Sequence, residues 1–235
     1  MSTTTPDYTV RTNYTDNLEE MRAAHKVLLE VPFTPSEPYR GYNMRSLHID
    51  LTTLTVTEKK VTQEMVDTFV GGRGFGLWYL WNATTPTTKW NDPENEIVIS
   101  PGPIAGITQY PGTGKSLVVS ISPLTDIPID CNVGGYYGPL LKFCGFDALE
   151  LQGKADREVV ILVDGPCGVI RIEEAPLEPA DSHICSEIFT HMYADGPADL
   201  KNVSVVSAGK GSDHSLIGCL NFSFYDAKRK AARLK

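Results

Sequence analysis

The alternation of apolar and polar residues predicts a chain that contains more strands than helices. Leu47, Ile49 and Leu51 alternate with polar residues, and the alternation resumes at Leu54 after a turn, which predicts a hairpin. Short apolar runs predict further strands over residues 97–100, 116–121, 148–151, 159–163, 169–172 and 203–207. Since these strands do not alternate regularly with helices, the predicted fold class is α+β.

Helix signals separate the strand runs. Thr62 can cap a helix over residues 63–70, and Gly71-Gly72 can end it. Helices are also predicted over residues 75–81, from about Tyr136, over 186–193, and as a basic helix over 226–235.

Residues 1–43 lack the strand-like alternation that begins at Met44. They are interpreted as an N-terminal extension, followed by a domain over residues 44–235. Asp16 and Glu19 resemble a capping box, and the apolar residues after them fit one face of a helix that ends near Glu30. Closely spaced prolines then predict an arm laid over another surface. A disordered tail is the alternative for this extension.

Composition and charge exclude several classes of protein. The chain has 235 residues, of which 41% are hydrophobic and 21% charged, so it can bury a core. A net charge of −8 argues against a nucleic-acid binder that relies on phosphate contacts. Mean hydropathy is −0.16, no run of 18 apolar residues occurs, and the first residues do not resemble a secretory signal. Five widely spaced cysteines favour reduced thiols, so a cytoplasmic location is expected.

Two familiar nucleotide-binding motifs fail on inspection. Residues 111–116 resemble the end of a phosphate-binding P-loop, but Gln109 stands where the motif needs a glycine and a strand follows. In residues 72–77 a leucine replaces the third glycine of a dinucleotide fingerprint. No cysteine pair has zinc or iron–sulfur spacing, and the histidines are scattered. Catalysis by side chains of this chain alone is therefore poorly supported.

Three glycine-rich segments could instead cradle an anion. They cover residues 71–74, 101–115 and 132–135. Glycines allow backbone amides to approach a ligand closely, and Lys115 adds a positive charge. Tight turns in a β-rich domain are the alternative explanation for each segment taken singly.

Taken in order, these segments and others resemble the N-terminal domain of the tungsten-dependent aldehyde:ferredoxin oxidoreductase family. The resemblance covers about residues 44–235. The matching stretches include Arg45-Ser-Leu-His-Ile-Asp-Leu-Thr52, Phe69-Val-Gly-Gly-Arg-Gly74, Ser100-Pro-Gly-Pro-Ile-Ala-Gly106, Ser122-Pro-Leu-Thr125, Asn132-Val-Gly-Gly-Tyr-Tyr-Gly138, Leu141-Lys-Phe-Cys-Gly-Phe-Asp147, Glu150-Leu-Gln-Gly-Lys-Ala155, Ser207-Ala-Gly209 and residues 217–235.

The resemblance implies a base of two sheets beneath a bis-pyranopterin cofactor that holds tungsten or molybdenum, with Mg²⁺ bridging the pterin phosphates. Lys115 looks like the counterpart of a family arginine between a pterin and a 4Fe-4S cluster. Asn132 resembles the residue whose backbone reaches the magnesium, and Gly134 and Gly135 those packed against the pterin. Arg73 is a further expected cofactor contact. Lysine in place of arginine loses the planar fork and keeps a point charge.

The resemblance also implies partners. Family members continue into helical domains that carry the cluster cysteines and the catalytic groups, so we expect a larger partner subunit, unless the chain is a fragment. The implied reaction oxidises an aldehyde to a carboxylic acid and passes electrons to the cluster and to ferredoxin. The alternatives are reduction of an aromatic acyl thioester and a cofactor-free scaffold. No catalytic residue, nucleic-acid partner or membrane span is expected in this chain.

Overall fold

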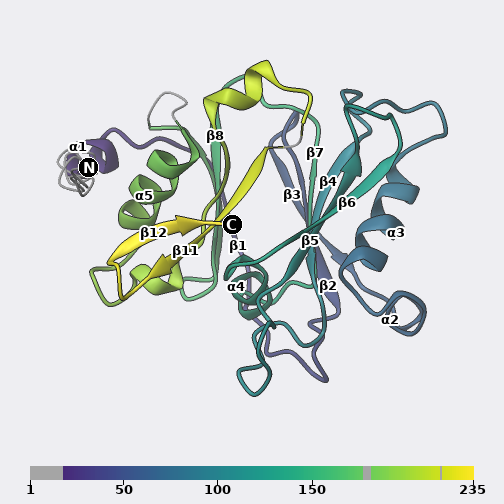
Figure 1. The fold of residues 1–235 in the computed structure, drawn as a ribbon, viewed down its shortest axis with the longest axis horizontal. Coiled ribbons are helices and arrows are strands. Elements are labelled where there is room, and N and C mark those ends of the chain that lie inside the picture. The colour runs from purple at the N-terminus through teal and green to yellow at the C-terminus, as the bar shows by residue number, and fades with distance from the viewer. Residues whose placement is uncertain (1–17, 177–180, 218) are drawn as a thin grey trace, which may run out of the picture.

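The computed structural model describes residues 18–176, 181–217 and 219–235 and confirms a β-rich α+β fold (Figure 1). The α-helices are α1 (Leu18–Ala23), α2 (Gln63–Phe69), α3 (Arg73–Ala83), α4 (Tyr137–Phe143) and α5 (Ser182–Tyr193), with short 3-10 helices at Leu200–Asn202 and Lys210–His214. The strands are β1 (Val27–Pro32), β2 (Arg45–Asp50), β3 (Thr55–Lys60), β4 (Glu96–Pro101), β5 (Ser116–Ile121), β6 (Pro128–Val133), β7 (Leu149–Gln152), β8 (Val159–Asp164), β9 (Val169–Glu174), β10 (Val206–Ala208), β11 (Leu220–Asp226) and β12 (Ala231–Leu234).

A six-stranded sheet in the order β3-β2-β7-β4-β5-β6 forms one layer. Its neighbouring strands are antiparallel except β2 and β7, which run parallel with Leu47 opposite Leu149. Alternate residues of these two strands face a core that also contains Ile170 and Ile172 of β9. The sheet β1-β9-β8 therefore lies across this core from β2 and β7, and α3 packs against β4 and β5 (Figure 1).

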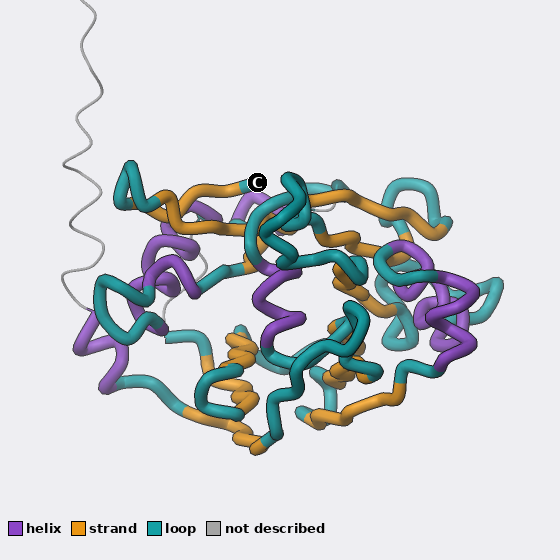
Figure 2. The backbone as a smooth tube through the Cα atoms, turned by 90° about the horizontal axis from the view of Figure 1, so that it is seen from below, coloured by secondary structure: helices purple, strands orange, loops and turns teal. Residues whose placement is uncertain are grey.

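The third sheet has the order β10-β11-β12 and packs against α5. Helix α4 contacts both β4 and β11, and the ring of Tyr137 lies edge-on to that of Phe222 at 5.5 Å. Seen from below, this helix stands in the middle of the molecule, with strands on both sides and loops crossing in front of it (Figure 2). Helix α4 thus joins the two halves of the fold.

The prediction of one helix up to Glu30 is wrong. Helix α1 ends at Ala23, and Val27–Pro32 forms strand β1, which pairs antiparallel with β9. Arg171 Nε of β9 lies 2.7 Å from Glu30 Oε2 across this pair. The apolar run fits either a helix or a strand locally, and its pairing with β9, far along the chain, decides the outcome. The capping residue proposed at Asp16 lies outside the described residues.

The prediction of a basic helix over residues 226–235 is also wrong, because β11 and β12 form a hairpin there. Asp226 Oδ1 accepts hydrogen bonds from the amides of Lys228 and Arg229, which closes the turn. Such an aspartate turn competes with helix formation, whatever the helix propensity of the neighbouring residues. The strand predicted over 203–207 is shifted to Val206–Ala208.

The other predicted elements are present with small changes in their ends. Thr62 caps α2 by accepting a hydrogen bond from the Met65 amide at 3.2 Å. Helix α3 extends beyond the predicted range to Arg73–Ala83, and α5 begins at Ser182, capped by Asp181. In the described part of the chain, no helix combines the length and apolarity needed to cross a bilayer.

Candidate ligand-binding groove

An open groove of about 390 Å³ lies at the N-terminal end of α3. Three loops and the adjoining strand ends line it. The lining residues are Val70, Gly71, Gly72, Arg73, Gly102, Pro103, Ile104, Ala105, Gly112, Thr113, Lys115, Leu117 and Asn132. The first glycine-rich segment and much of the second thus face the same space, together with Asn132 from the third.

Strand pairing explains why these distant segments meet. In the β5–β6 ladder, Asn132 is opposite Leu117, so it lies close to Lys115, which directly precedes β5. The amide of Gly72 donates to the Pro101 carbonyl at 3.1 Å, which ties the first segment to the end of β4. The groove is therefore built where β4, β5 and β6 end beside the first turn of α3.

Glycine is required at the junction of the second and third segments. A β-carbon added at Gly114 would stand 2.4 Å from the carbonyl oxygen of Gly135. Because this oxygen belongs to the backbone, it cannot move aside as a flexible side chain could. At Gly102 and Gly112, by contrast, no atom lies within 4 Å of an added β-carbon. Both of these glycines line the groove, so side chains there would enter its space. Gly114 thus allows the backbones of the second and third segments to touch, while Gly102 and Gly112 leave the lining of the groove free of side chains.

The structure brings three of the sequence-predicted site residues, Arg73, Lys115 and Asn132, to this groove. Gly134 and Gly135 follow β6 and are not among the lining residues, although an added β-carbon at Gly134 would lie 3.9 Å from Lys115 Nζ. The Arg73 guanidinium contacts Asp130 Oδ2 of β6 at 2.8 Å and is largely exposed. Two cationic residues thus line one groove, an arrangement that suits an anion.

The sequence prediction missed Val70, whose side chain also lines the groove and is 55% exposed. Its position directly before Gly71-Gly72 was interpreted only as the end of a helix. No group of three or more His, Cys, Asp and Glu within the described residues could hold a metal ion. The groove therefore offers cations and backbone groups and no metal-ligating side-chain cluster.

A second cavity of about 520 Å³ lies at the other end of α3 and was not predicted. His48, Lys59, Glu96 and Gln152 of the sheet face Trp78, Tyr79 and Asn82 of α3 there. The sequence signal was misleading, because polar residues that alternate with apolar ones in a strand usually face solvent.

This second cavity is lined by the buried carboxylate of Glu96, and the buried carboxylate of Glu150 lies close enough to affect its charge. Glu150 is fully buried and accepts hydrogen bonds from Lys59 Nζ at 2.5 Å and from Ser46 Oγ at 2.7 Å. His48 Nε2 lies 3.2 Å from Gln152 Oε1 and 3.7 Å from Glu96 Oε1. Burial, reinforced by the charge of Glu150, raises the pKa of Glu96 to about 7, against the opposing effect of Lys59.

Comparison with known proteins identifies the domain. The family model for the aldehyde ferredoxin oxidoreductase N-terminal domain matches residues 46–234. The chain belongs to the aldehyde ferredoxin oxidoreductase family. The family resemblance seen in the sequence is thereby confirmed.

Relatives in this family are similar over part of the chain. The tungsten-containing aldehyde ferredoxin oxidoreductase of Pyrococcus abyssi is 37% identical over 123 residues, which cover 52% of this chain and 20% of the relative. The aliphatic sulfonate oxidoreductase WOR-like subunit of Pyrococcus furiosus is 32% identical over 134 residues, which cover 56% of this chain and 21% of that subunit. The match thus spans about a fifth of the length of these relatives.

A solved structure shows the same fold. The active-site complex BamBC of benzoyl coenzyme A reductase, with bound 1,5 dienoyl-CoA, contains a chain similar to this one with a TM-score of 0.66. Sequence identity is 22%, and the match covers 74% of this chain and 25% of that chain.

Proposed function

We propose that this chain forms the cofactor-binding base of a tungsten or molybdenum oxidoreductase, with a bis-pyranopterin in the groove at the N-terminal end of α3. The observation that carries the proposal is the convergence of Arg73, Lys115 and Asn132 on that groove. The relatives named as tungsten-containing enzymes support it. The residues present fit such a group, because Gly102 and Gly112 leave space for a flat ligand and the two cations suit its phosphates.

Each groove residue has a role in this proposal. Lys115 and Arg73 donate charge-assisted hydrogen bonds to the anionic part of the cofactor. The backbone of Asn132 would hold the Mg²⁺ that accompanies the cofactor, and Gly134 and Gly135, which follow it outside the lining residues, would adjoin a pterin. The cofactor, when bound, supplies two-electron redox chemistry. This chain binds and orients it.

The remaining machinery belongs to other parts of the enzyme in this proposal. A larger partner subunit or further domains supply the 4Fe-4S cluster, the catalytic groups and the substrate pocket. The match to about a fifth of each relative supports this division. The proposed reaction converts an aldehyde and water to a carboxylic acid and transfers two electrons to the cluster and then to ferredoxin. Turnover assays with aldehydes and with an aromatic acyl-CoA distinguish this reaction from acyl thioester reduction.

Elemental analysis of the purified complex tests the proposal. We expect tungsten or molybdenum near one atom per copy of this chain, together with releasable pterin. A complex that contains neither the metal nor the pterin would establish the alternative, a scaffold without cofactor.

Substitution of Lys115 tests the assignment of the groove. Lys115→Met keeps most of the side-chain length and removes the charge, so we expect cofactor affinity to fall by one to two decades, about 1.5–3 kcal/mol. Lys115→Arg is the control and should be nearly neutral, because it preserves the charge and adds a planar fork. Unchanged metal content in the assembled Lys115→Met enzyme would contradict the assignment.

A further inference from the structure

The backbone is strained at Val70, on the edge of the groove. Val70 follows the last residue of α2 and has φ 64° and ψ −43°. The amide of Gly71 donates to the carbonyl of Phe69 at 2.7 Å, which closes a γ-turn around Val70. Turns of this hand are rare and strained, and a β-branched residue with positive φ is an outlier.

A hydrogen bond from the N-terminal arm holds this turn. The hydroxyl of Tyr42 donates to the Val70 carbonyl at 2.6 Å. Burial, and secondarily the charge of Asp147, raises the pKa of Tyr42, so its hydroxyl stays protonated and keeps donating. The strained carbonyl is therefore fixed by a residue that lies outside the groove.

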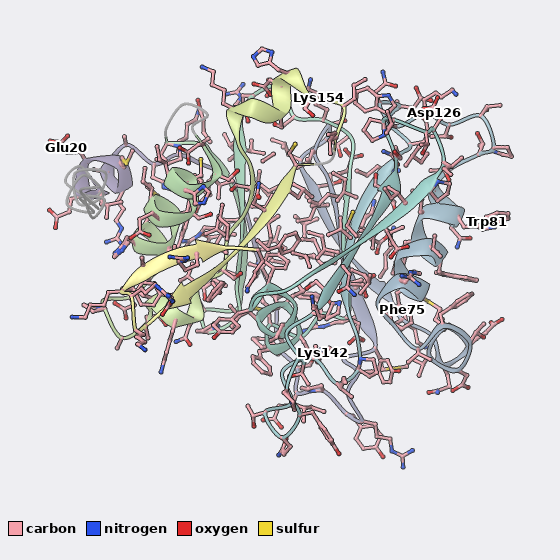
Figure 3. All side chains as sticks on the ribbon, viewed as in Figure 1. Glu20, Phe75, Trp81, Asp126, Lys142 and Lys154 are labelled. Carbon is pink, nitrogen blue, oxygen red and sulfur yellow. The ribbon has the colours of Figure 1, made fainter. Side chains whose placement is uncertain are left out.

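Tyr42 is itself held firmly from both sides. Its neighbour Gly41 accepts a hydrogen bond from Lys142 Nζ, and the amide of Asn43 donates to the carboxylate of Asp147 at 3.0 Å. Lys142 and Asp147 form a buried ion pair at 3.2 Å, and Lys142 Nζ lies 5.6 Å from the centre of the Tyr42 ring. Figure 3 shows Lys142 on α4, below the centre of the molecule. The arm thus connects the buried core of the domain to the edge of the groove.

Packing within the domain does not account for the strain. The Val70 side chain is 55% exposed, and glycine at this position would adopt a positive φ at far lower cost, as Gly71 and Gly72 do next to it. Backbone strain that is not compensated by burial occurs mainly at ligand sites, where the surrounding structure enforces it. The strained turn keeps Val70 in the lining of the groove, where it joins the apolar residues Ile104, Ala105 and Leu117.

We propose that Val70 forms the apolar wall against which the flat ring system of the bound ligand packs, and that Tyr42 is the positioning residue that holds Val70 there. This inference rests on the proposed function, since it takes a pyranopterin as the ligand. The wall contributes van der Waals contact, while Lys115 and Arg73 contribute charge.

Three variants of the assembled enzyme test the inference. Val70→Gly removes the wall and the strain, Tyr42→Phe removes only the hydroxyl, and Val70→Gly/Tyr42→Phe combines them. The control is Lys230→Gly, which relieves a positive φ of 51° in the β11–β12 turn, away from the lining of the groove. Three quantities are measured: the apparent melting temperature of the cofactor-free protein, the hydrogen-exchange rate of its Gly71 amide, and the rate at which tungsten and fluorescent pterin are released on dialysis.

We expect Val70→Gly to melt no lower than the wild type while it releases cofactor about tenfold faster. Tyr42→Phe should also release cofactor faster, and the double variant should match Val70→Gly, because Tyr42 acts through Val70. Lys230→Gly should leave the release rate unchanged. In the cofactor-free protein, Tyr42→Phe should speed hydrogen exchange of the Gly71 amide about tenfold, the size expected for one lost hydrogen bond.

Two results overturn the inference and are distinguishable from failure of the proposed function. If the wild type retains metal and pterin and Val70→Gly retains them equally well, Val70 is not a wall. If the effects of Tyr42→Phe and Val70→Gly on release simply multiply, Tyr42 does not act through Val70. A wild-type enzyme that holds neither metal nor pterin instead refutes the proposed function, and this inference falls with it.

Discussion

The two ends of α3 handle charge in opposite ways. At its first turn, Arg73 is 62% exposed and pairs with Asp130 at the rim of the groove. Along its last turns, α3 covers Glu96 and Glu150, which are 2% and 0% exposed. Buried charges without partners are expensive, and Glu150 accepts hydrogen bonds from Lys59 and Ser46. Glu96 has His48 nearby, at 3.7 Å, and its Oε2 has no hydrogen-bond partner among the described residues. The comparison indicates that the buried charges beside the second cavity contribute to the stability of the fold. The exposed charges of Arg73 and Lys115 at the groove stay accessible to a ligand.

The largest expected effect comes from breaking the pair that Lys59 forms with the buried Glu150. Lys59→Met leaves Glu150 charged and fully buried, with only the Ser46 hydroxyl as a hydrogen-bond donor among the contacts described above. We expect the free energy of unfolding to fall by about 3 kcal/mol, as for other uncompensated buried charges. Chemical denaturation measures the change.

The adjacent Lys60 provides the control, because it lines the same cavity from the same strand but is exposed to solvent. Lys60→Met should change stability by less than about 0.5 kcal/mol. Equal effects of the two lysine substitutions would remove the contrast between the two ends of α3. Adding Glu150→Gln to Lys59→Met should recover part of the loss, since it removes the unpaired charge.

A pH titration of stability tests Glu96 in the same cavity, and the expected change in the free energy of unfolding is similar to that for Lys59→Met or slightly smaller. Glu96 has a pKa of about 7 in the folded chain, whereas its ordinary value is 4.5. Between these two pH values the folded chain therefore keeps the Glu96 proton that the unfolded chain has lost. The free energy of unfolding should therefore fall as the pH rises from about 4.5 to 7, by at most about 3 kcal/mol. Glu96→Gln should flatten this dependence in thermal or chemical unfolding.

The exposed neighbour Glu94 supplies the matched control for that titration. Glu94→Gln should retain the wild-type slope between pH 4.5 and 7. If Glu96→Gln and Glu94→Gln show the same slope, the buried carboxyl does not control the pH dependence of stability.

The smallest effect on stability is expected at the groove. Arg73→Met removes an ion pair between an exposed arginine and a partly exposed aspartate, and such surface pairs contribute about 0–1 kcal/mol. We expect a change of no more than about 0.5 kcal/mol in chemical denaturation, together with faster release of metal and pterin from the assembled enzyme. Asp130→Asn should be equally mild for stability without faster release. A large loss of stability in Arg73→Met would contradict the contrast, because it would show that Arg73 contributes to the fold as the buried charges under α3 do.

The local sequence was sufficient to predict those helices and strands whose pairing or capping partners are near in the chain. The hairpin of β2 and β3 follows from alternation and a short turn, and α2 follows from the Thr62 cap. Strand β1 was predicted as helix because Leu28 and Leu29 suit either structure, and its pairing partner β9 lies far along the chain. The final hairpin was missed because Ala, Lys and Arg favour helices, while the Asp226 turn and the pairing with β11 favour strands.

The candidate site was predictable to a similar degree. Arg73, Lys115 and Asn132 were predicted from glycine segments and a family resemblance. The β5–β6 register brings Lys115 and Asn132 together, and the hydrogen bond from Gly72 to Pro101 brings the segment of Arg73 beside them. Val70 and Tyr42 were not predictable, because a positive φ at valine and a hydrogen bond between distant loops leave no local signature. The buried charges under α3 were missed because alternation alone does not show which face of a strand a helix will cover.

The position of β7 has a consequence for the order of folding. Strands β2 and β3 form a hairpin, and β4, β5 and β6 form a meander, each from segments that follow closely in the chain. Strand β7 is the last of the six to be synthesised, yet it lies between β2 and β4 and alone joins the two groups. Such non-local pairing slows folding. On the ribosome, the inner edges of β2 and β4 therefore stay unpaired until Leu149–Gln152 emerges, and these edges are where a nascent chain would aggregate.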